Sequence, residues 1–262
     1  MSTGETWARR LAAGGPIEEP VAVVVAHPDD ETLWTGSALR RLRDATLVVV
    51  TDGAPEDMGD AHRLGFRTRA DYASARATEL DAALLALEFA GRLVQYEVQD
   101  QGTAAEVASI ADRLTINCAG AAVIVTHPYE GGHPDHDSVA LASRIAADRL
   151  RVPVVEFACY ARFDGSRVFA RFVDDADRPE YRRPLDTDDR ARVERALQAH
   201  ASQQSVFGTW RPDVERWRAA PRYDFGRPPP GEAVLYDEFD WTMTAERWRA
   251  IVRTALDTTA WV

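Results

Sequence analysis

Two unbroken apolar runs, each followed at once by histidine and carboxylate residues, most constrain the fold of this chain. The first run, Val21–Val25, leads into residues 26–31 (AHPDDE), and the second, 121–125, leads closely into residues 127–137 (HPYEGGHPDHD). Runs this apolar are typical of strands that are buried on both faces of a parallel sheet. Because the carboxyl ends of parallel strands share one edge, we expect the two polar segments to meet there, where open α/β sheets bind ligands.

Strand and helix patterns alternate along the first part of the chain. The further expected strands are Thr46–Val50, Leu93–Val98 and Pro153–Tyr160, and the expected helices are Thr35–Arg43, Thr68–Leu87, Ala104–Asn117 and Pro134–Leu150. This alternation predicts a Rossmann-like α/β fold with a doubly wound, mainly parallel sheet and helices on both faces.

The length fits one domain that covers residues 1–262, with a core at about 18–160. In the C-terminal part, 161–262, we expect a hairpin turn at 162–167 and helices near 188–204 and 244–256. This part is too short for a core of its own, so we expect it to complete the domain and the rim of the pocket.

Composition favours small-molecule chemistry. The chain has 31 basic and 42 acidic residues and a formal charge of -11, which argues against a nucleic-acid or membrane partner. Cys118 and Cys159 lack CxxC spacing, so neither a disulfide framework nor a thiolate zinc site is indicated. The first twenty residues lack the apolar core of a signal peptide, and we expect a cytoplasmic protein. A homo-oligomer is compatible with the sequence, although oligomer contacts leave no readable pattern in it.

Three residues of the polar segments supply a metal site. A catalytic zinc takes three protein ligands and keeps a fourth position open to water, and His27, Asp30 and His136 form such a set. Pro134 is typical of the first turn of a helix, which places His136 in that turn and His133 just before it. We expect one Zn2+ per chain, although Fe2+ or Co2+ also suits these ligands.

Hydrolysis of an amide also needs a group that takes a proton from water and a group that stabilises the oxyanion or protonates the leaving amine. Asp29 and His133 are the remaining candidates in the two segments. We expect Asp135 to orient His133, which would then act on the oxyanion as an imidazolium.

Both segments closely resemble the motifs of the PIG-L/LmbE-like family, which comprises zinc-dependent de-N-acetylases that act on N-acetylglucosaminyl lipids, sugars and thiol-precursor glycosides. Residues 26–31 match the first family motif completely, and residues 133–136 (HPDH) match the second. The resemblance implies a set of roles: metal ligands His27, Asp30 and His136, general base Asp29, and acid or oxyanion stabiliser His133.

Three further residues are candidates for the substrate site. A weaker likeness to the family extends to Arg76 and Asp100, whose counterparts often line that site. Arg76 and Glu79 also have the spacing of a surface ion pair, and Asp100 also fits the cap of the next helix. His127 is either a substrate-binding residue or a hydrogen-bonded structural histidine.

Tryptophans raise a separate question about the pocket. Trp34 stands where many family members have a small, glycine-rich segment, so it either narrows the pocket or packs in the core. Trp210, Trp217, Trp241 and Trp248 either stack on a sugar or pack in the core and at interfaces.

The sequence therefore predicts a zinc-dependent hydrolase that removes an N-acyl group, first of all an N-acetyl group, from a small sugar-like or glycoside substrate such as an N-acetylglucosamine derivative. One alternative is a zinc amidase that cleaves a larger amide, such as a thiol conjugate or an antibiotic precursor. A second is a non-catalytic Rossmann-type binding protein, which the absence of GxGxxG after the first strand disfavours. A third is a metal phosphoesterase, an enzyme class that often uses two ions.

Overall fold

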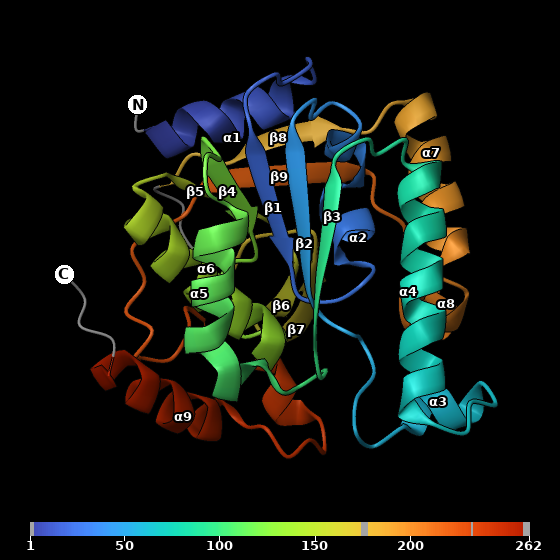
Figure 1. Ribbon diagram of the computed structural model, residues 1–262, viewed down its shortest axis with the longest axis vertical. Coiled ribbons are helices and arrows are strands. Elements are labelled where there is room, and N and C mark those ends of the chain that lie inside the picture. Colours follow the sequence, from blue (N-terminus) through green and yellow to red (C-terminus); the bar gives the residue numbers. More distant parts are fainter. Residues whose placement is uncertain (1–2, 174–177, 232, 259–262) are drawn as a thin grey trace.

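The computed structural model describes residues 3–173, 178–231 and 233–258. Within them, the main sheet consists of β1 (Val21–Val25), β2 (Ala45–Thr51), β3 (Arg92–Val98), β4 (Val123–Thr126), β5 (Val154–Phe157), β8 (Tyr181–Pro184) and β9 (Val214–Ala219). Their order is β3-β2-β1-β4-β5-β9-β8 (Figure 1). The strands from β3 to β5 run parallel, whereas β9 is antiparallel to both β5 and β8. A separate hairpin is formed by β6 (Tyr160–Phe163) and β7 (Ser166–Phe169).

Helices cover both faces of the sheet (Figure 1). The α-helices are α1 (Thr3–Ala13), α2 (Asp30–Leu39), α3 (Gly59–Arg63), α4 (Arg69–Ala86), α5 (Val107–Asn117), α6 (Pro134–Leu150), α7 (Thr187–Ala199), α8 (Gln204–Phe207) and α9 (Ala245–Thr258), and the short 3-10 helices are η1 (Thr103–Glu106), η2 (Ala201–Gln203) and η3 (Leu235–Glu238). One core contains Val21, Val23 and Val25 and packs against α1, α2, α4 and α7, and a second contains Ala22 and Val24 and packs against α5, α6 and α9. The predicted α/β fold with helices on both faces is confirmed.

Every residue of β1 is buried, which explains why this strand is apolar throughout rather than alternating. The neighbours of β1 are β2 and β4, with Val21 opposite Ala45 on one side and Val123 on the other. Since β1 and β4 are direct parallel neighbours, the segments that follow them leave the sheet at the same edge.

Helix ends follow the sequence signals. Thr68 caps α4, because its side chain accepts a hydrogen bond from the Asp71 N–H. Pro134 opens α6, which ends at Leu150 as expected. In contrast, α2 begins at Asp30, within the first motif, and not at Thr35 as the sequence suggested.

One strand prediction was wrong. The expected strand Pro153–Tyr160 divides into β5 and β6, which belong to different sheets. The chain leaves the main sheet after Phe157, and Tyr160 pairs with Phe169 in the hairpin. This division places Tyr160 in the hairpin, where it packs against the first core and lines the pocket at the edge at which the polar segments meet.

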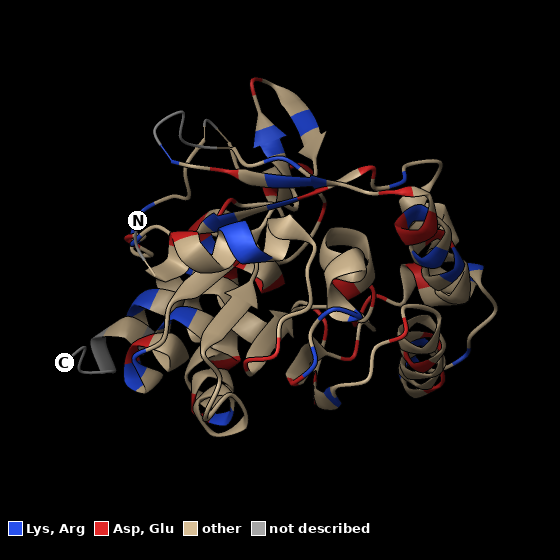
Figure 2. Cartoon of the chain, turned by 90° about the horizontal axis from the view of Figure 1, so that it is seen from above, with Lys and Arg blue, Asp and Glu red and all other residues tan. Residues whose placement is uncertain are grey.

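Surface charge is mixed in the part of the chain that the structure describes. Figure 2 shows arginine and acidic positions interspersed over helices, strands and loops. Among the described residues, no helix combines the length and the apolar composition that a membrane crossing requires.

Strand β9 contains buried charged side chains, and Glu215 allows the energetic cost of burying one of them to be measured. The Ser37 N–H and hydroxyl both donate to the Glu215 carboxylate at 2.6 Å. Burial nevertheless raises the pKa of Glu215 from an ordinary value of 4.5 to about 7. A carboxyl whose pKa is raised by folding is held most favourably while protonated, so its contribution to stability declines as the pH rises from the unfolded pKa to the folded pKa.

Glu215→Gln keeps the shape of the side chain and a hydrogen-bond acceptor. We therefore expect the stability of this variant relative to the wild type to increase as the pH rises. The free energy of unfolding of the variant relative to the wild type should shift by about 3 kcal/mol in favour of the variant between about pH 4.5 and about pH 7.5. Chemical denaturation at both pH values measures this shift. A difference that does not change with pH would show that Glu215 does not titrate in this range.

Candidate active site

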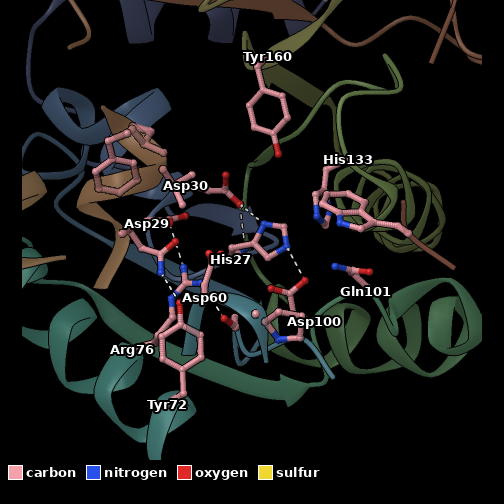
Figure 3. Close-up of a pocket in the computed structure, with 18 of the residues that line it drawn as sticks. His27, Asp29, Asp30, Asp60, Tyr72, Arg76, Asp100, Gln101, His133 and Tyr160 are labelled. Carbon is pink, nitrogen blue, oxygen red and sulfur yellow. Dashed lines mark hydrogen bonds and ion pairs between the residues drawn. The ribbon is translucent and has the colours of Figure 1, made fainter. Parts of the chain in front are cut away.

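The adjacent strands β1 and β4 bring the two polar segments together. His27 follows β1, Asp30 opens α2 and His136 lies in the first turn of α6. Asp30 Oδ2 lies 3.2 Å from His27 Nδ1, and Asp30 Oδ1 lies 3.2 Å from His136 Nε2. One donor atom from each residue falls within 4.8 Å of the others. Figure 3 shows His27 and Asp30 at the centre of the pocket.

These three side chains fit a divalent cation. His136 Nε2 is buried and makes no hydrogen bond to any described residue, which is rare for a buried polar atom. Burial raises the pKa of Asp30, but the histidines around it, His136 foremost, bring the net pKa well below its usual range, so this carboxyl is ionised. An ionised carboxylate between two imidazoles is a donor set that suits zinc and similar cations.

Arg76 holds the carboxylate of Asp29 beside this donor set. Arg76 Nη2 donates to Asp29 Oδ2 at 2.9 Å and to the Pro28 carbonyl at 3.1 Å. Glu79, the alternative partner of Arg76, accepts hydrogen bonds from the N–H and hydroxyl of Ser202 instead. Arg76 is thus a buried residue of the pocket and not part of a surface ion pair.

His133 caps the N-terminus of α6 with its ring. Its Nδ1 accepts a hydrogen bond from the Asp135 N–H at 3.1 Å, so the hydrogen of the neutral imidazole lies on Nε2. Burial lowers the pKa of His133 to about 3, and the charge of His27 acts in the same direction. The structure therefore gives a neutral His133, which differs from the imidazolium that we expected.

Asp135 orients His27, and the predicted partner His133 was wrong. Asp135 Oδ2 lies 3.2 Å from His27 Nε2 and 3.9 Å from His133 Nδ1. The carboxylate also accepts hydrogen bonds from the Gln101 N–H at 2.6 Å and from the N–H and hydroxyl of Thr103. Metal-binding histidines commonly have their second ring nitrogen held by a carboxylate in this way. His133 is not oriented by this carboxylate, because its Nδ1 is already occupied as the helix cap.

The two remaining candidates differ in position. Asp100 lines the pocket, and its Oδ1 lies 3.5 Å from His27 Nε2. Asp100 does not cap the following helix, since the residue at the start of η1 is Gly102. His127 is fully buried and lies outside the pocket lining.

Contacts of His127 support the structural alternative. Its Nε2 accepts a hydrogen bond from the Ala26 N–H at 2.9 Å, and its Nδ1 lies 3.3 Å from Cys159 Sγ. Its ring stacks on His136 with 4.0 Å between the ring centroids. His127 therefore packs behind a residue of the donor set and does not face the pocket.

The pocket at this edge has a volume of about 430 Å3, which is within the range of small-molecule sites. Its lining includes the predicted residues His27, Asp29, Asp30, Arg76, Asp100 and His133. Sequence reasoning missed several others, among them Tyr160 and Gln101, which Figure 3 labels. Neither residue belongs to a recognisable motif. The position of Tyr160 depends on the hairpin, and that of Gln101 depends on the loop after β3.

Tyr160 points its hydroxyl into the pocket, toward His27 and Asp30 (Figure 3). Its ring lies 5.2 Å from that of His136, and burial raises the pKa of its hydroxyl well above the usual range. A Cβ atom at Gly132 would lie only 2.1 Å from the Tyr160 carbonyl oxygen. The glycine that precedes the second motif thus allows the hairpin to approach the site closely.

Comparison with known proteins agrees with this geometry. Residues 22–147, which contain both motifs, match the family model PIG-L, described as GlcNAc-PI de-N-acetylase. Residues 22–147 therefore resemble a PIG-L family domain. The match confirms the expectation of an enzyme that hydrolyses an amide. It also argues against the alternative of a non-catalytic binding protein.

Solved structures show the same fold. The zinc-inhibited form of teicoplanin deacetylase Orf2 is 16% identical, with a TM-score of 0.61 over 78% of this chain and 99% of that chain. The deacetylase Dbv21, which acts on the A40926 pseudoaglycone, is 17% identical, with a TM-score of 0.59 over 79% and 99% of the two chains. The N,N'-diacetylchitobiose deacetylase from Pyrococcus horikoshii is 16% identical, with a TM-score of 0.50 over 73% and 74%. A search of curated proteins found no match.

Trp34 is both a core residue and a pocket residue. It is 3% exposed, belongs to the first core and lines the pocket. Its Nε1 donates to Asp30 Oδ1 at 3.0 Å, so it also holds a carboxylate of the donor set. Trp210 and Trp241 line the pocket, whereas Trp217 and Trp248 are fully buried in the core.

Proposed function

We propose that this protein is a metal-dependent hydrolase, with zinc as the expected ion, that removes an N-acetyl group from a small N-acylated amino sugar or glycoside. The convergence of donor atoms from His27, Asp30 and His136, with His27 and Asp30 lining one pocket together with Asp29, is the observation that carries the proposal. The PIG-L match and the deacetylases with the same fold support this reaction.

We also propose that residues 1–262 act as a single domain. The C-terminal part contributes Phe169, Gln203, Trp210 and Trp241 to the pocket lining, so the pocket is incomplete without it.

His27, Asp30 and His136 are the residues that would hold the metal. A divalent ion bound there would polarise the amide carbonyl and lower the pKa of a water molecule. The contact between Asp135 and His27 fixes the ring so that Nδ1 faces Asp30, which keeps the donors together before any ion binds.

Asp29 is the proposed general base. Arg76 binds its Oδ2, so Oδ1 is the oxygen that we assign as the proton acceptor. Water attacks the acyl carbon, and its proton goes to Asp29 Oδ1. Asp29 then passes this proton to the amide nitrogen as the carbon–nitrogen bond breaks, which releases the amine and the carboxylic acid.

Two neutral donors are available for the oxyanion that forms during the attack. The His133 ring carries its hydrogen on Nε2, because Nδ1 accepts the Asp135 N–H. The Tyr160 hydroxyl points into the same part of the pocket (Figure 3). Fixed donors that face a developing negative charge stabilise the transition state more than the substrate.

Replacing Tyr160 with phenylalanine is expected to lower kcat roughly 100-fold, because one oxyanion donor is lost while the ring keeps its packing against His136. KM should change little, since the oxyanion exists only after the water attacks. Steady-state kinetics of amine release measures both constants. A normal kcat with a raised KM would show that Tyr160 binds the substrate without acting on the oxyanion.

The reaction itself is tested by amine release from a panel of N-acylated amino sugars, with phosphate monoesters assayed in parallel. We expect free amine and free acetate in equal amounts from at least one N-acetyl sugar. Release of phosphate without any amine would contradict the proposal and favour a phosphoesterase.

A further inference from the structure

The pocket lining contains a group of apolar residues, which we call the apolar wall. It consists of six residues from α2, β7, α8 and the loop that follows α8: Leu33, Trp34, Phe169, Val206, Phe207 and Trp210. Charged and polar residues, including Asp60, Arg76, Asp100 and Gln101, form other parts of the lining. The pocket therefore presents surfaces of different chemistry to a substrate.

Two large hydrophobic residues of the apolar wall are exposed to solvent and are not packed into the core. Phe169 is 47% exposed and Val206 is 62% exposed, although both are large hydrophobic residues. Aromatic rings join the wall into one surface, with 5.7 Å between the Phe169 and Trp210 centroids and 5.3 Å between those of Trp34 and Trp210. Exposed apolar surface that is contiguous and lines a concavity typically marks a binding site.

The apolar wall begins at the reacting centre. Trp34 donates its indole N–H to Asp30 Oδ1, and its ring lies 5.9 Å from that of Tyr160. A group that lies against Trp34 is therefore close to the scissile amide, and Trp210 and Phe169 continue the surface away from it. The occupant of the wall must be connected to the amide by few bonds.

A second sugar ring does not match this surface. The side chains of Leu33, Phe169, Val206 and Phe207 are hydrocarbon and offer no partner to a hydroxyl group. Sugar hydroxyls that lose water without gaining hydrogen bonds weaken binding. Alkyl or aryl groups, in contrast, gain free energy when they leave water for such a surface.

We propose, on the basis of the proposed function, that the apolar wall binds an alkyl or aryl substituent of the substrate. The substrate class is then an N-acylated amino sugar that carries an apolar group close to its amide, either as the acyl chain or as the aglycone. Each methylene buried on the wall should raise kcat/KM about fourfold, so a phenyl or longer alkyl group should raise it at least about tenfold.

The two sources of the apolar group are separated by matched substrates. One series varies the aglycone of N-acetylglucosamine, as methyl, phenyl and octyl glycosides, and the other varies the acyl group of the methyl glycoside, as acetyl, butyryl and hexanoyl. We expect kcat/KM to rise along one of the two series in the wild type. Equal kcat/KM along both series would overturn the proposal.

Variants of exposed residues locate the effect. Phe169→Ala and Val206→Ala should remove most of the preference for the apolar group, measured in each protein as the ratio of kcat/KM for the phenyl, octyl or hexanoyl substrate to kcat/KM for the methyl N-acetyl glycoside. Phe163→Ala is the matched control, because Phe163 lies on the same hairpin, is 39% exposed and is outside the pocket lining. An equal loss in Phe163→Ala would overturn the assignment to the wall.

Calorimetric binding of reaction products, namely the deacylated phenyl and octyl glycosides of glucosamine and the free acid hexanoate, provides a readout that needs no turnover. We expect the phenyl and octyl glycosides to bind the wild type at least about tenfold more tightly than methyl glucosaminide does, or hexanoate at least about tenfold more tightly than acetate, and we expect this factor to be smaller in Phe169→Ala. If this preference is present but no substrate is hydrolysed, the proposed reaction fails while the apolar wall remains. If substrates are hydrolysed without any such preference, the apolar wall fails while the reaction remains.

Discussion

Replacing His136 with alanine is expected to abolish metal binding and amine release together. His136 Nε2 is a buried nitrogen without a hydrogen bond to any described residue, and it lies 3.2 Å from Asp30 Oδ1. Removing it leaves two of the three proposed protein ligands, which is fewer than a catalytic zinc site uses. We expect the affinity for Zn2+ to fall by at least about 100-fold and amine release to become undetectable.

Metal content after gel filtration and amine release measure the two effects, and circular dichroism confirms that the variant is folded. His62→Ala is the matched control, because His62 is exposed on α3 and lies outside the pocket lining. The control should keep its metal and its activity. Full metal content in His136→Ala would exclude His136 as a ligand.

Replacing Asp29 with asparagine is expected to separate metal binding from catalysis. Asparagine keeps the shape of the side chain and an oxygen that accepts the hydrogen bond from Arg76, but it does not take a proton from water. We expect kcat to fall roughly 1,000-fold while the metal content stays at the wild-type level. The combination of full metal content and lost turnover is the signature of a general base.

Asp81→Asn, at an exposed position of α4 away from the pocket, is the control for the loss of one negative charge. Its kcat should equal that of the wild type. If Asp29→Asn retained a wild-type kcat, proton acceptance would have to be assigned to another group.

Most of the parallel part of the sheet could be predicted, because strands buried on both faces leave continuous apolar runs such as Val21–Val25. Strand β9 could not be predicted, since its sequence contains charged residues that are buried against partners elsewhere in the fold. Arg218 is 2% exposed and lies 2.9 Å from Glu156 and 2.8 Å from Glu130. A strand whose buried side chains are charged has the composition of a loop, and only its partners show that it belongs to the sheet.

The core of the site could also be predicted, because motifs at the ends of neighbouring parallel strands must meet. Sequence placed His27, Asp30 and His136 together, and the structure brings their donor atoms within 4.8 Å. The partner of Asp135 could not be predicted from the sequence, because adjacency in sequence favours His133, whereas in the fold the carboxylate contacts His27. Tyr160 could not be found from sequence, since its place depends on a hairpin that leaves the main sheet.

Spacing along a helix also left one question open that packing answers. An arginine three residues before a glutamate can form a surface pair or face inward, and sequence does not distinguish the two. In the structure, Arg76 turns inward to Asp29 because α4 packs along the edge of the pocket.

Metal dependence of amine release is the measurement that tests the central claim most directly. The protein would be stripped with a chelator, assayed with N-acetylglucosamine glycosides, and assayed again after Zn2+ is added back. The account predicts about one ion per chain as purified, no release from the stripped protein, and recovered release at one equivalent of Zn2+. Undiminished amine release by protein without any bound metal would contradict it.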